Sequence, residues 1–160
     1  MSHLIAKVSI GGGQNLRTKD EILKILDLLE GNIADDFEAQ DLDFKEWVEK
    51  SLNDNINLAV KMAVCMANGG GGTVVFGIRD KVKGRKNAII GVPPIVDAFL
   101  MQKAVYERTD PHITPTFDWI EVPEGHGRIL VMNIYPGMPP YTETNASATI
   151  RIGKERTCFR

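Results

Sequence analysis

Acidic side chains in two parts of this 160-residue chain are spaced so that they could share one site. They are Glu38, Asp41 and Asp43, which lie within six residues, and Asp80, which follows a β-branched run. Clustered carboxylates can hold a divalent metal, which lowers the pKa of a bound water and stabilises charge on a phosphodiester during hydrolysis. Glu38 can reach Asp43 only if the chain bends between them. From the spacing alone, a solvated acidic loop is the favoured interpretation and a metal site is the alternative.

Basic side chains gather in two stretches that could follow a nucleic-acid backbone. The first stretch contains Arg79, Lys81, Lys83, Arg85 and Lys86. The second lies on or beyond the expected last strand and contains Arg151, Lys154, Arg156 and Arg160. Such cations bind phosphates with an affinity that falls as salt rises, because binding releases counterions. A solvated charged loop is an equal alternative for the first stretch.

A glycine run follows the longest apolar pattern of the chain and precedes an expected strand. It consists of Asn68, Gly69, Gly70, Gly71 and Gly72. Consecutive backbone N–H groups can bind a phosphate, but the spacing matches neither GxxxxGK[ST] nor GxGxxG. A tight turn from helix to strand is therefore the favoured interpretation, and a nucleotide at this turn is the alternative.

The overall composition fits a folded domain, with 43% hydrophobic and 25% charged residues. The net charge of −2 hides a segregation, because residues 18–60 carry four basic and twelve acidic side chains, whereas residues 61–160 carry thirteen basic and nine acidic ones. Two cysteines far apart in the sequence, Cys65 and Cys158, favour a reducing compartment. No export signal or long apolar run is present, so we expect a cytoplasmic protein without a membrane span.

Hydrophobic periodicity and helix caps predict the elements that position these residues. Helices are expected over about residues 18–31, 54–67 and 95–108. Strands are expected over residues 42–45, 73–78, 88–92, 113–122, 128–135 and 148–152. Two hairpins should form, 73–78 with 88–92 and 113–122 with 128–135, and Asp54 should cap the second helix. The apolar face of the first helix, formed by Ile22, Leu26 and Leu29, could support a homodimer or belong to the core.

On the first strand, Asp43 and Lys45 are two residues apart and share a face, as a metal ligand and a phosphate-facing cation would need to. The order of elements predicts the fold class, a mixed α/β domain whose mixed sheet is flanked by about three helices. No internal repeat or low-complexity linker divides the chain. The abrupt end after a strand suggests a domain taken from a longer polypeptide.

Several segments occur in an order that one domain family shares. They are residues 38–46, the Ala-Asn-glycine stretch through Asp80, and residues 89–92, 113–115 and 150–153. Together they resemble the Schlafen-type AlbA_2 domain, also called the divergent AAA-4 domain. The resemblance covers about residues 18–157 and leaves 1–17 as an N-terminal extension. It implies a single AlbA-like domain that binds DNA or RNA, and a longer chain with a further C-terminal regulatory part.

The resemblance also implies site residues. Vertebrate Schlafen ribonucleases cleave structured RNA with a carboxylate triad and a divalent metal, and the matching positions here are Glu38, Asp43 and Asp80. Asp43 stands where those enzymes have Glu, which shortens the reach by one methylene. The first expectation is a DNA-binding module of a transcriptional regulator. The alternative is an endoribonuclease that uses Mg²⁺ or Mn²⁺, with Lys45 beside the scissile phosphate. An ATP-binding regulatory domain is the third.

Overall fold

The computed structural model describes residues 16–49, 51–138, 140–144, 150–152 and 156–159, the last two segments as backbone. The helices are α1 (Lys19–Leu28), the 3₁₀ turn η3 (Ala34–Phe37), α2 (Leu52–Asn68), α3 (Arg85–Ala88) and α4 (Ala98–Glu107). The strands are β1 (Leu42–Lys45), β2 (Gly72–Phe76), β3 (Thr109–Asp110), β4 (Thr116–Glu121), β5 (Arg128–Ile134), β6 (Thr142–Glu143), β7 (Ile150–Ile152) and β8 (Arg156–Phe159).

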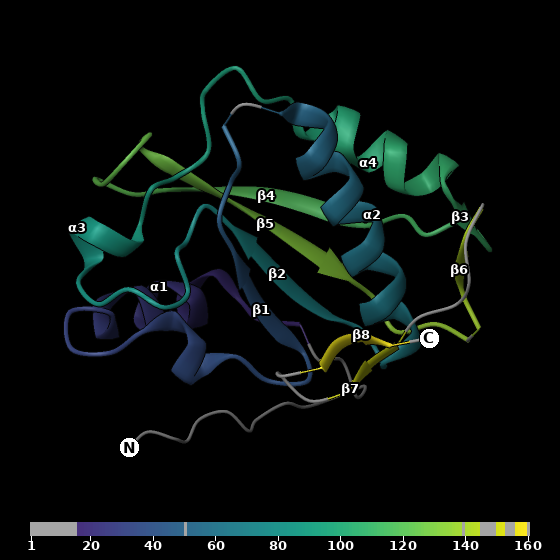
Figure 1. Cartoon of the computed structure of the whole chain (residues 1–160), viewed down its shortest axis with the longest axis horizontal. Coiled ribbons are helices and arrows are strands. Elements are labelled where there is room, and N and C mark those ends of the chain that lie inside the picture. The colour runs from purple at the N-terminus through teal and green to yellow at the C-terminus, as the bar shows by residue number, and fades with distance from the viewer. Residues whose placement is uncertain (1–15, 50, 139, 145–149, 153–155, 160) are drawn as a thin grey trace.

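A four-stranded sheet in the order β1-β2-β5-β4 forms the centre of the molecule (Figure 1). Helices α2 and α4 pack on one face, where their apolar side chains meet Val74, Phe76 and Met132. Helix α1 packs on the other face, against Val75 and Val131 among others. The mixed α/β fold class predicted from the sequence is confirmed.

Helix α1 begins with the predicted capping box. The Thr18 hydroxyl accepts a hydrogen bond from the Glu21 N–H at 3.1 Å, and the Glu21 carboxylate accepts one from the Thr18 N–H at 2.8 Å. The apolar face formed by Ile22, Leu26 and Leu29 is buried against the sheet. This face therefore belongs to the core of the chain and is not available for the homodimer that the sequence left open.

Strands β1 and β2 are parallel, with Asp43 opposite Val74, and α2 connects them. The N-cap of α2 is Ser51, whose hydroxyl accepts from the Asp54 N–H at 3.2 Å, so the predicted Asp54 cap is wrong. Because parallel strands end at the same edge of a sheet, the segments that follow β1 and β2 are brought together. The Gly77 N–H, just after β2, donates to the Lys45 carbonyl at 2.7 Å.

The hairpin predicted between residues 73–78 and 88–92 is wrong. Strand β2 pairs with β1 on one side and with β5 on the other, which leaves no edge for a third partner. The segment between the two halves of the predicted hairpin instead contains most of α3, which follows Gly84 at a φ of +91°. One isolated bridge, between Ile78 and Ile89, joins the two segments.

The other predicted hairpin is confirmed as the antiparallel pair β4 and β5. Near the C-terminus, β7 overlaps the predicted strand 148–152 and pairs with β8, which the sequence analysis did not identify. Residues 148 and 149 lie outside the described part. None of the helices in that part has both the length and the apolar character needed to cross a bilayer.

Cys65, inside α2, is disulfide-bonded. Strand β8, which contains the other cysteine of the chain, Cys158, packs against α2. The fold thus brings together two segments that are far apart in the sequence. The reducing compartment inferred from that separation is not supported.

Candidate metal centre

Three carboxylates meet beside the C-terminal ends of β1 and β2. Asp35 lies in η3, Glu38 ends that turn, and Asp80 follows β2. One oxygen from each lies within 4.8 Å of an oxygen of the other two, and all three side chains are half-buried. The Asp35 N–H donates to the Asp80 carbonyl at 2.8 Å, which fixes the two segments to each other.

Asp35 was not among the residues selected from the sequence. It lies three residues before Glu38, and in a 3₁₀ turn side chains three residues apart are on the same side. The spacing was therefore a usable signal, but it required knowing that residues 34–37 form such a turn.

Asp43 adjoins this cluster from β1. Its side chain is 1% exposed and hydrogen-bonds the Glu38 side chain. The chain reverses between Ala39 and Leu42, whose backbones are hydrogen-bonded to each other, and this brings the Glu38 carboxylate within 3.0 Å of the Phe44 nitrogen, whose N–H it accepts. The bend that Glu38 required is therefore present. Glu38, Asp43 and Asp80 form one neighbourhood with Asp35.

Two other residues named from the sequence are engaged in ion pairs. Lys45 Nζ lies 3.1 Å from Asp43 Oδ2, so the two side chains share a face as predicted, and the ammonium binds the carboxylate. Asp41 lies apart from the cluster, because its carboxylate pairs with the Arg17 guanidinium at 2.6 Å.

Burial raises the pKa of Glu38 to about 8, and the negative charges of Asp43 and Asp80 act in the same direction. The Phe44 N–H favours the charged carboxylate and opposes part of this rise. Packing several carboxylates together without a cation is unfavourable when all are charged. A bound cation would relieve this repulsion.

The donor set suits a hard divalent cation. All donors are carboxylate oxygens, which Mg²⁺ and Mn²⁺ prefer over softer ligands. Asp35, Glu38 and Asp80 are only half-buried, so an ion that keeps several water ligands could reach them. The residues therefore fit the metal that the Schlafen resemblance implies.

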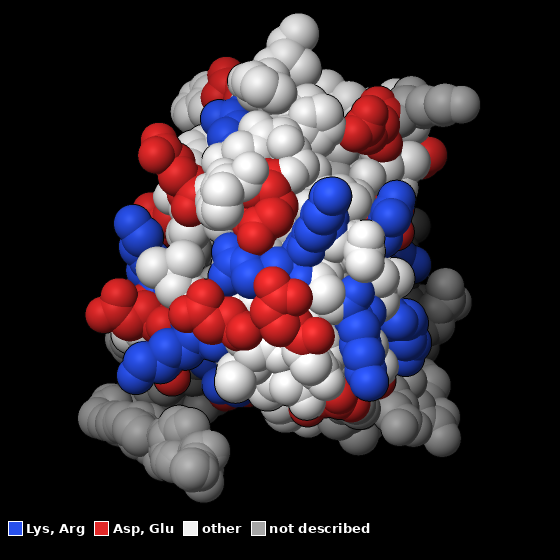
Figure 2. Space-filling view, turned by 90° about the vertical axis from the view of Figure 1, so that its left-hand side faces the viewer, with Lys and Arg blue, Asp and Glu red and all other residues white. Residues whose placement is uncertain are grey.

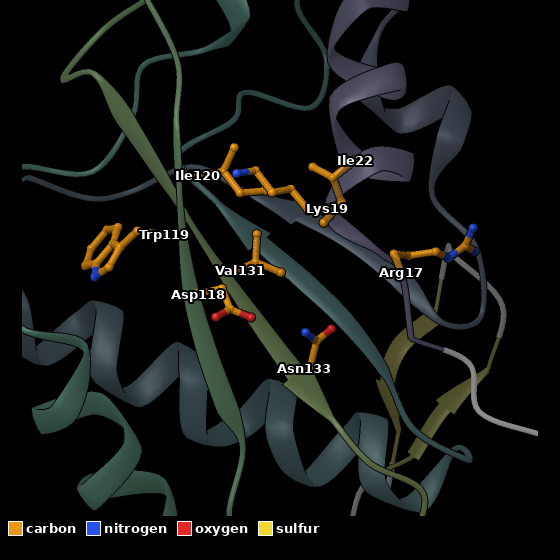
Figure 3. Close-up of a pocket in the computed structure, with 8 residues that line it drawn as sticks. All are labelled: Arg17, Lys19, Ile22, Asp118, Trp119, Ile120, Val131 and Asn133. Carbon is orange, nitrogen blue, oxygen red and sulfur yellow. The ribbon is translucent and has the colours of Figure 1, made fainter. Parts of the chain in front are cut away.

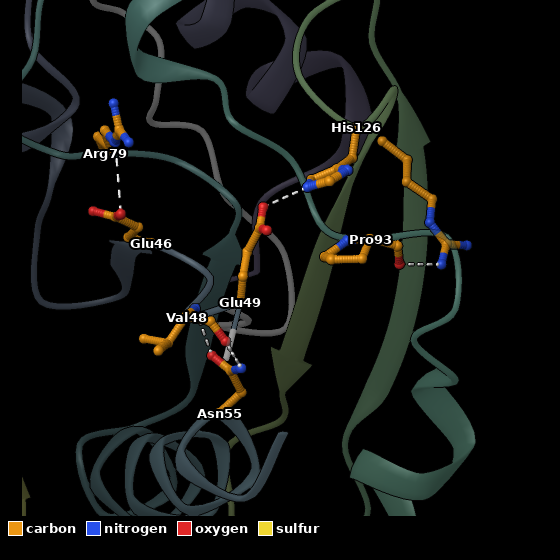
Figure 4. Close-up of polar contacts among 8 residues, drawn as sticks. Glu46, Val48, Glu49, Asn55, Arg79, Pro93 and His126 are labelled. Atoms are coloured by element: carbon orange, nitrogen blue, oxygen red, sulfur yellow. Dashed lines mark hydrogen bonds and ion pairs between the residues drawn. The ribbon is translucent and has the colours of Figure 1, made fainter. Parts of the chain in front are cut away.

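The segment after β1 is held by polar contacts (Figure 4). The Asn55 side chain accepts from the Val48 N–H at 2.9 Å and donates to the Val48 carbonyl at 2.6 Å. Glu46 pairs with Arg79 at 3.6 Å, and Glu49 contacts His126 Nε2 at 2.6 Å. These contacts fix the edge of the sheet that borders the carboxylates.

The first basic stretch does not form a continuous track of unpaired cations. Besides Arg79, Lys81 pairs with Asp35 at 3.1 Å. Arg85 pairs with Glu124 at 2.7 Å and with Asp27 at 2.8 Å. Figure 2 shows acidic and basic side chains interleaved on the end of the molecule that carries α1 and α3.

Lys83 and Lys86, by contrast, are exposed and have no ion pair within the described part of the chain. In the second basic stretch, Arg151 and Arg156 are described by their backbones alone, and Lys154 and Arg160 lie outside the described residues. Whether the two basic stretches share a surface, which the sequence could not show, therefore stays open.

The glycine run uses its N–H groups inside the protein. Gly69 and Gly70 donate to carbonyls of α2 at 3.0–3.5 Å, and Gly71 donates to the Met66 carbonyl at 2.7 Å. Gly71 has a φ of +92°, and a Cβ there would lie 2.8 Å from the Ile134 carbonyl oxygen. Asn68 donates to the Tyr141 carbonyl and accepts from its N–H. These contacts give the run a role in packing, and these N–H groups are occupied.

A pocket of about 360 Å³ opens on the α1 face of the sheet (Figure 3), and the carboxylates of the cluster are not among its lining residues. It is lined by Arg17, Lys19, Ile22, Asp118, Trp119, Ile120, Val131 and Asn133. Beside it, the Arg17 backbone N–H donates to the Thr73 hydroxyl at 2.9 Å, and this hydroxyl donates to the side-chain amide oxygen Oδ1 of Asn133 at 2.8 Å. The sequence analysis did not identify this pocket.

The fold and the site define a class: a mixed α/β domain with a carboxylate cluster where two parallel strands end. Residues 38–158 match the family model described as Schlafen, AlbA_2, and the chain belongs to this family. The family has a nucleic-acid-related function. A search of the curated proteins finds no match to the chain.

Among solved structures, the DIP2311 protein from Corynebacterium diphtheriae is similar, with a TM-score of 0.57 and 25% sequence identity. The similarity covers 75% of this chain and 24% of that protein. This chain therefore spans about a quarter of the length of the larger protein.

Proposed function

We propose that this chain is a nucleic-acid-binding domain that holds Mg²⁺ or Mn²⁺ at its carboxylate cluster and hydrolyses phosphodiester bonds of RNA. The observation that carries the proposal is the meeting of Asp35, Glu38 and Asp80, with ligand oxygens within 4.8 Å of one another, in a member of the Schlafen AlbA_2 family. Of the expectations from the sequence, this is the ribonuclease alternative.

The residues around the cluster have separate tasks in this proposal. A bound divalent ion would activate a water molecule and stabilise negative charge on the phosphate. Glu38 and Asp80 hold the ion, and Asp43 keeps the Lys45 ammonium beside it, where it can bind a phosphate oxygen. Lys83, which precedes α3, and Lys86, which lies in α3, are exposed and attract the RNA backbone.

Incubation of structured RNA with the protein and MgCl₂ or MnCl₂ tests the proposal. We expect cleavage that chelation abolishes. Asp80→Asn should reduce the rate by more than the roughly 10–100-fold that loss of an outer-shell partner typically costs. Asp36→Asn is the matched control, because Asp36 is an exposed neighbour in η3 outside the cluster, and it should cleave normally. RNA that stays intact with both metals, or cleavage that survives Asp80→Asn, would refute the proposal.

A second candidate is the DNA-binding regulatory module without catalysis. The exposed Lys83 and Lys86 favour it, because they are available to phosphates whether or not a metal binds. Fluorescence anisotropy with duplex DNA and structured RNA separates the two candidates. Salt-dependent binding to duplex DNA together with intact RNA supports the second. Absence of binding to both nucleic acids at micromolar protein excludes both functions.

A further inference from the structure

We propose that Asp35, rather than Asp43, is the third carboxylate ligand of the metal, and that Asp43 is a positioning residue for Glu38 and Lys45. This inference rests on the metal-binding function proposed above. It differs from the assignment that the family resemblance implies, in which Asp43 completes the triad.

Ligand spacing favours Asp35. Oxygen ligands of Mg²⁺ or Ca²⁺ lie about 2.0–2.6 Å from the ion, so two ligands of one ion are separated by at most about 4–5 Å. Asp35, Glu38 and Asp80 each offer an oxygen that meets this limit with the other two, to within 4.8 Å. The backbone hydrogen bond from Asp35 to Asp80 holds two of these ligands at a fixed separation.

Burial and charge disfavour Asp43 as a ligand. Its side chain is 1% exposed, whereas those of Asp35 and Asp80 are half-buried. Mg²⁺ keeps several of its waters when it binds a protein, so its ligands must face an open space. The Asp43 carboxylate is also engaged by the Lys45 ammonium at 3.1 Å and by Glu38. An aspartate here is one methylene shorter than the glutamate of the ribonucleases, which further limits its reach.

The ion pair between Asp35 and Lys81 is compatible with metal binding. The Lys81 side chain is 68% exposed, and water screens an ion pair that is this exposed, so the pair contributes little to stability. Lys81 can therefore leave Asp35 at little cost when a divalent cation arrives. Its ammonium would then be free to bind a phosphate next to the ion.

Metal binding without RNA tests this assignment. Titration of the protein with Mn²⁺, followed by the loss of the free-ion electron paramagnetic resonance signal, gives the affinity directly. Asp35→Asn should weaken Mn²⁺ binding at least about tenfold, by more than Asp43→Asn does. Asp36→Asn should match the wild type.

A cysteine scan identifies the ligand itself. A thiolate bound to Cd²⁺ produces a charge-transfer absorption band in the ultraviolet, and Cd²⁺ is soft enough to prefer sulfur. Asp35→Cys should produce this band above the wild-type background, whereas Asp43→Cys and Asp36→Cys should not.

The outcomes distinguish a failure of the proposed function from a failure of the Asp35 assignment alone. If the wild type binds no Mn²⁺, the proposed function and this assignment both fail. If the wild type binds Mn²⁺ but Asp35→Asn binds it equally well, or only Asp43→Cys gives the cadmium band, then Asp35 is not the third ligand. In that case this assignment alone is overturned.

Discussion

The carboxylate cluster and the basic segment 79–86 are neighbours, but their charges are arranged differently: the acids of the cluster converge, whereas most cations of the segment are separated by ion pairs with acids. Asp35, Glu38 and Asp80 come from two separate parts of the chain and converge, with ligand oxygens within 4.8 Å. The basic segment has five cations within eight residues, and three of them pair with acids elsewhere. Proximity in sequence therefore did not produce a basic patch, whereas distant acids produced an acidic one.

Backbone contacts explain the difference. The acids are held by short side chains on segments joined by hydrogen bonds, such as Asp35 to Asp80 and Phe44 to Glu38. The cations have long side chains that reach acids on other elements. Arg85 shows this most clearly, because it joins α3 to Asp27 of α1 and to Glu124 in the β4–β5 turn. Within one basic segment, some cations stabilise the fold and others remain available to a ligand.

Arg85→Ala should have the largest effect, on stability. The Arg85 and Glu124 side chains are each 16% exposed. Removal of the Arg85 guanidinium therefore leaves the mostly buried Glu124 carboxylate without its ion-pair partner. We expect a loss of about 1–3 kcal/mol in the free energy of unfolding, measured by urea denaturation.

Lys83→Ala is the matched control, because it removes an exposed cation two residues away and should change stability by less than about 0.5 kcal/mol. Equal losses of stability in the two variants would show that Arg85 does not stabilise the fold more than the exposed Lys83 does.

Lys83→Glu combined with Lys86→Glu should have an intermediate effect, on nucleic-acid binding rather than stability. Each lysine that contacts a phosphate releases counterions, and the logarithm of affinity depends on the logarithm of salt with a slope of about 0.7–0.9 per contact. We expect binding about tenfold weaker at low salt, and a smaller slope, in anisotropy measurements across a salt series.

Lys61→Glu combined with Lys103→Glu changes the net charge equally, but on α2 and α4, far from the basic segment (Figure 1). This control should bind nearly as well as the wild type. Equal weakening by both pairs would indicate that net charge alone drives binding.

The sequence predicted elements well where the signal was local. The capping box of α1, the buried α2 and the β4–β5 hairpin all follow from periodicity and turn residues within one element. The hairpin predicted between 73–78 and 88–92 failed because strand pairing depends on distant partners. β2 lies between β1 and β5; its β-branched residues are typical of a central strand, but they do not indicate which strands are its neighbours.

The candidate site was predictable only in part, because some of its contacts join residues that are distant in the sequence. The resemblance pointed to Glu38, Asp43 and Asp80, and these residues do lie in one neighbourhood. Asp35 was missed because its side chain joins them only through the 3₁₀ turn. Arg85 was predicted to bind nucleic acid, but it pairs with Glu124, which is 39 residues away in the sequence. Sequence spacing carries no information about a pair this distant.

At pH 5, where the Glu38 carboxyl of the wild type is protonated, Glu38→Gln should have the smallest of these effects, and the growth of its effect with pH tests whether burial and the neighbouring acids disfavour the charged carboxylate. The pKa of Glu38 is raised from 4.5 to about 8, so the folded protein binds this proton more tightly than the unfolded chain does. The stability that the protonated carboxyl provides is complete below about pH 4.5 and is lost as the pH rises through about 8.

Glutamine stays neutral and can still hydrogen-bond Asp43. Without added metal, the Tm of Glu38→Gln relative to the wild type should therefore increase between pH 5 and pH 8.5, by about 2–4 °C for each kcal/mol. Glu107→Gln, which changes an exposed carboxyl of α4, should show a constant difference. A constant difference for Glu38→Gln as well would mean that neither burial nor the neighbouring acids disfavour the charged Glu38 carboxylate.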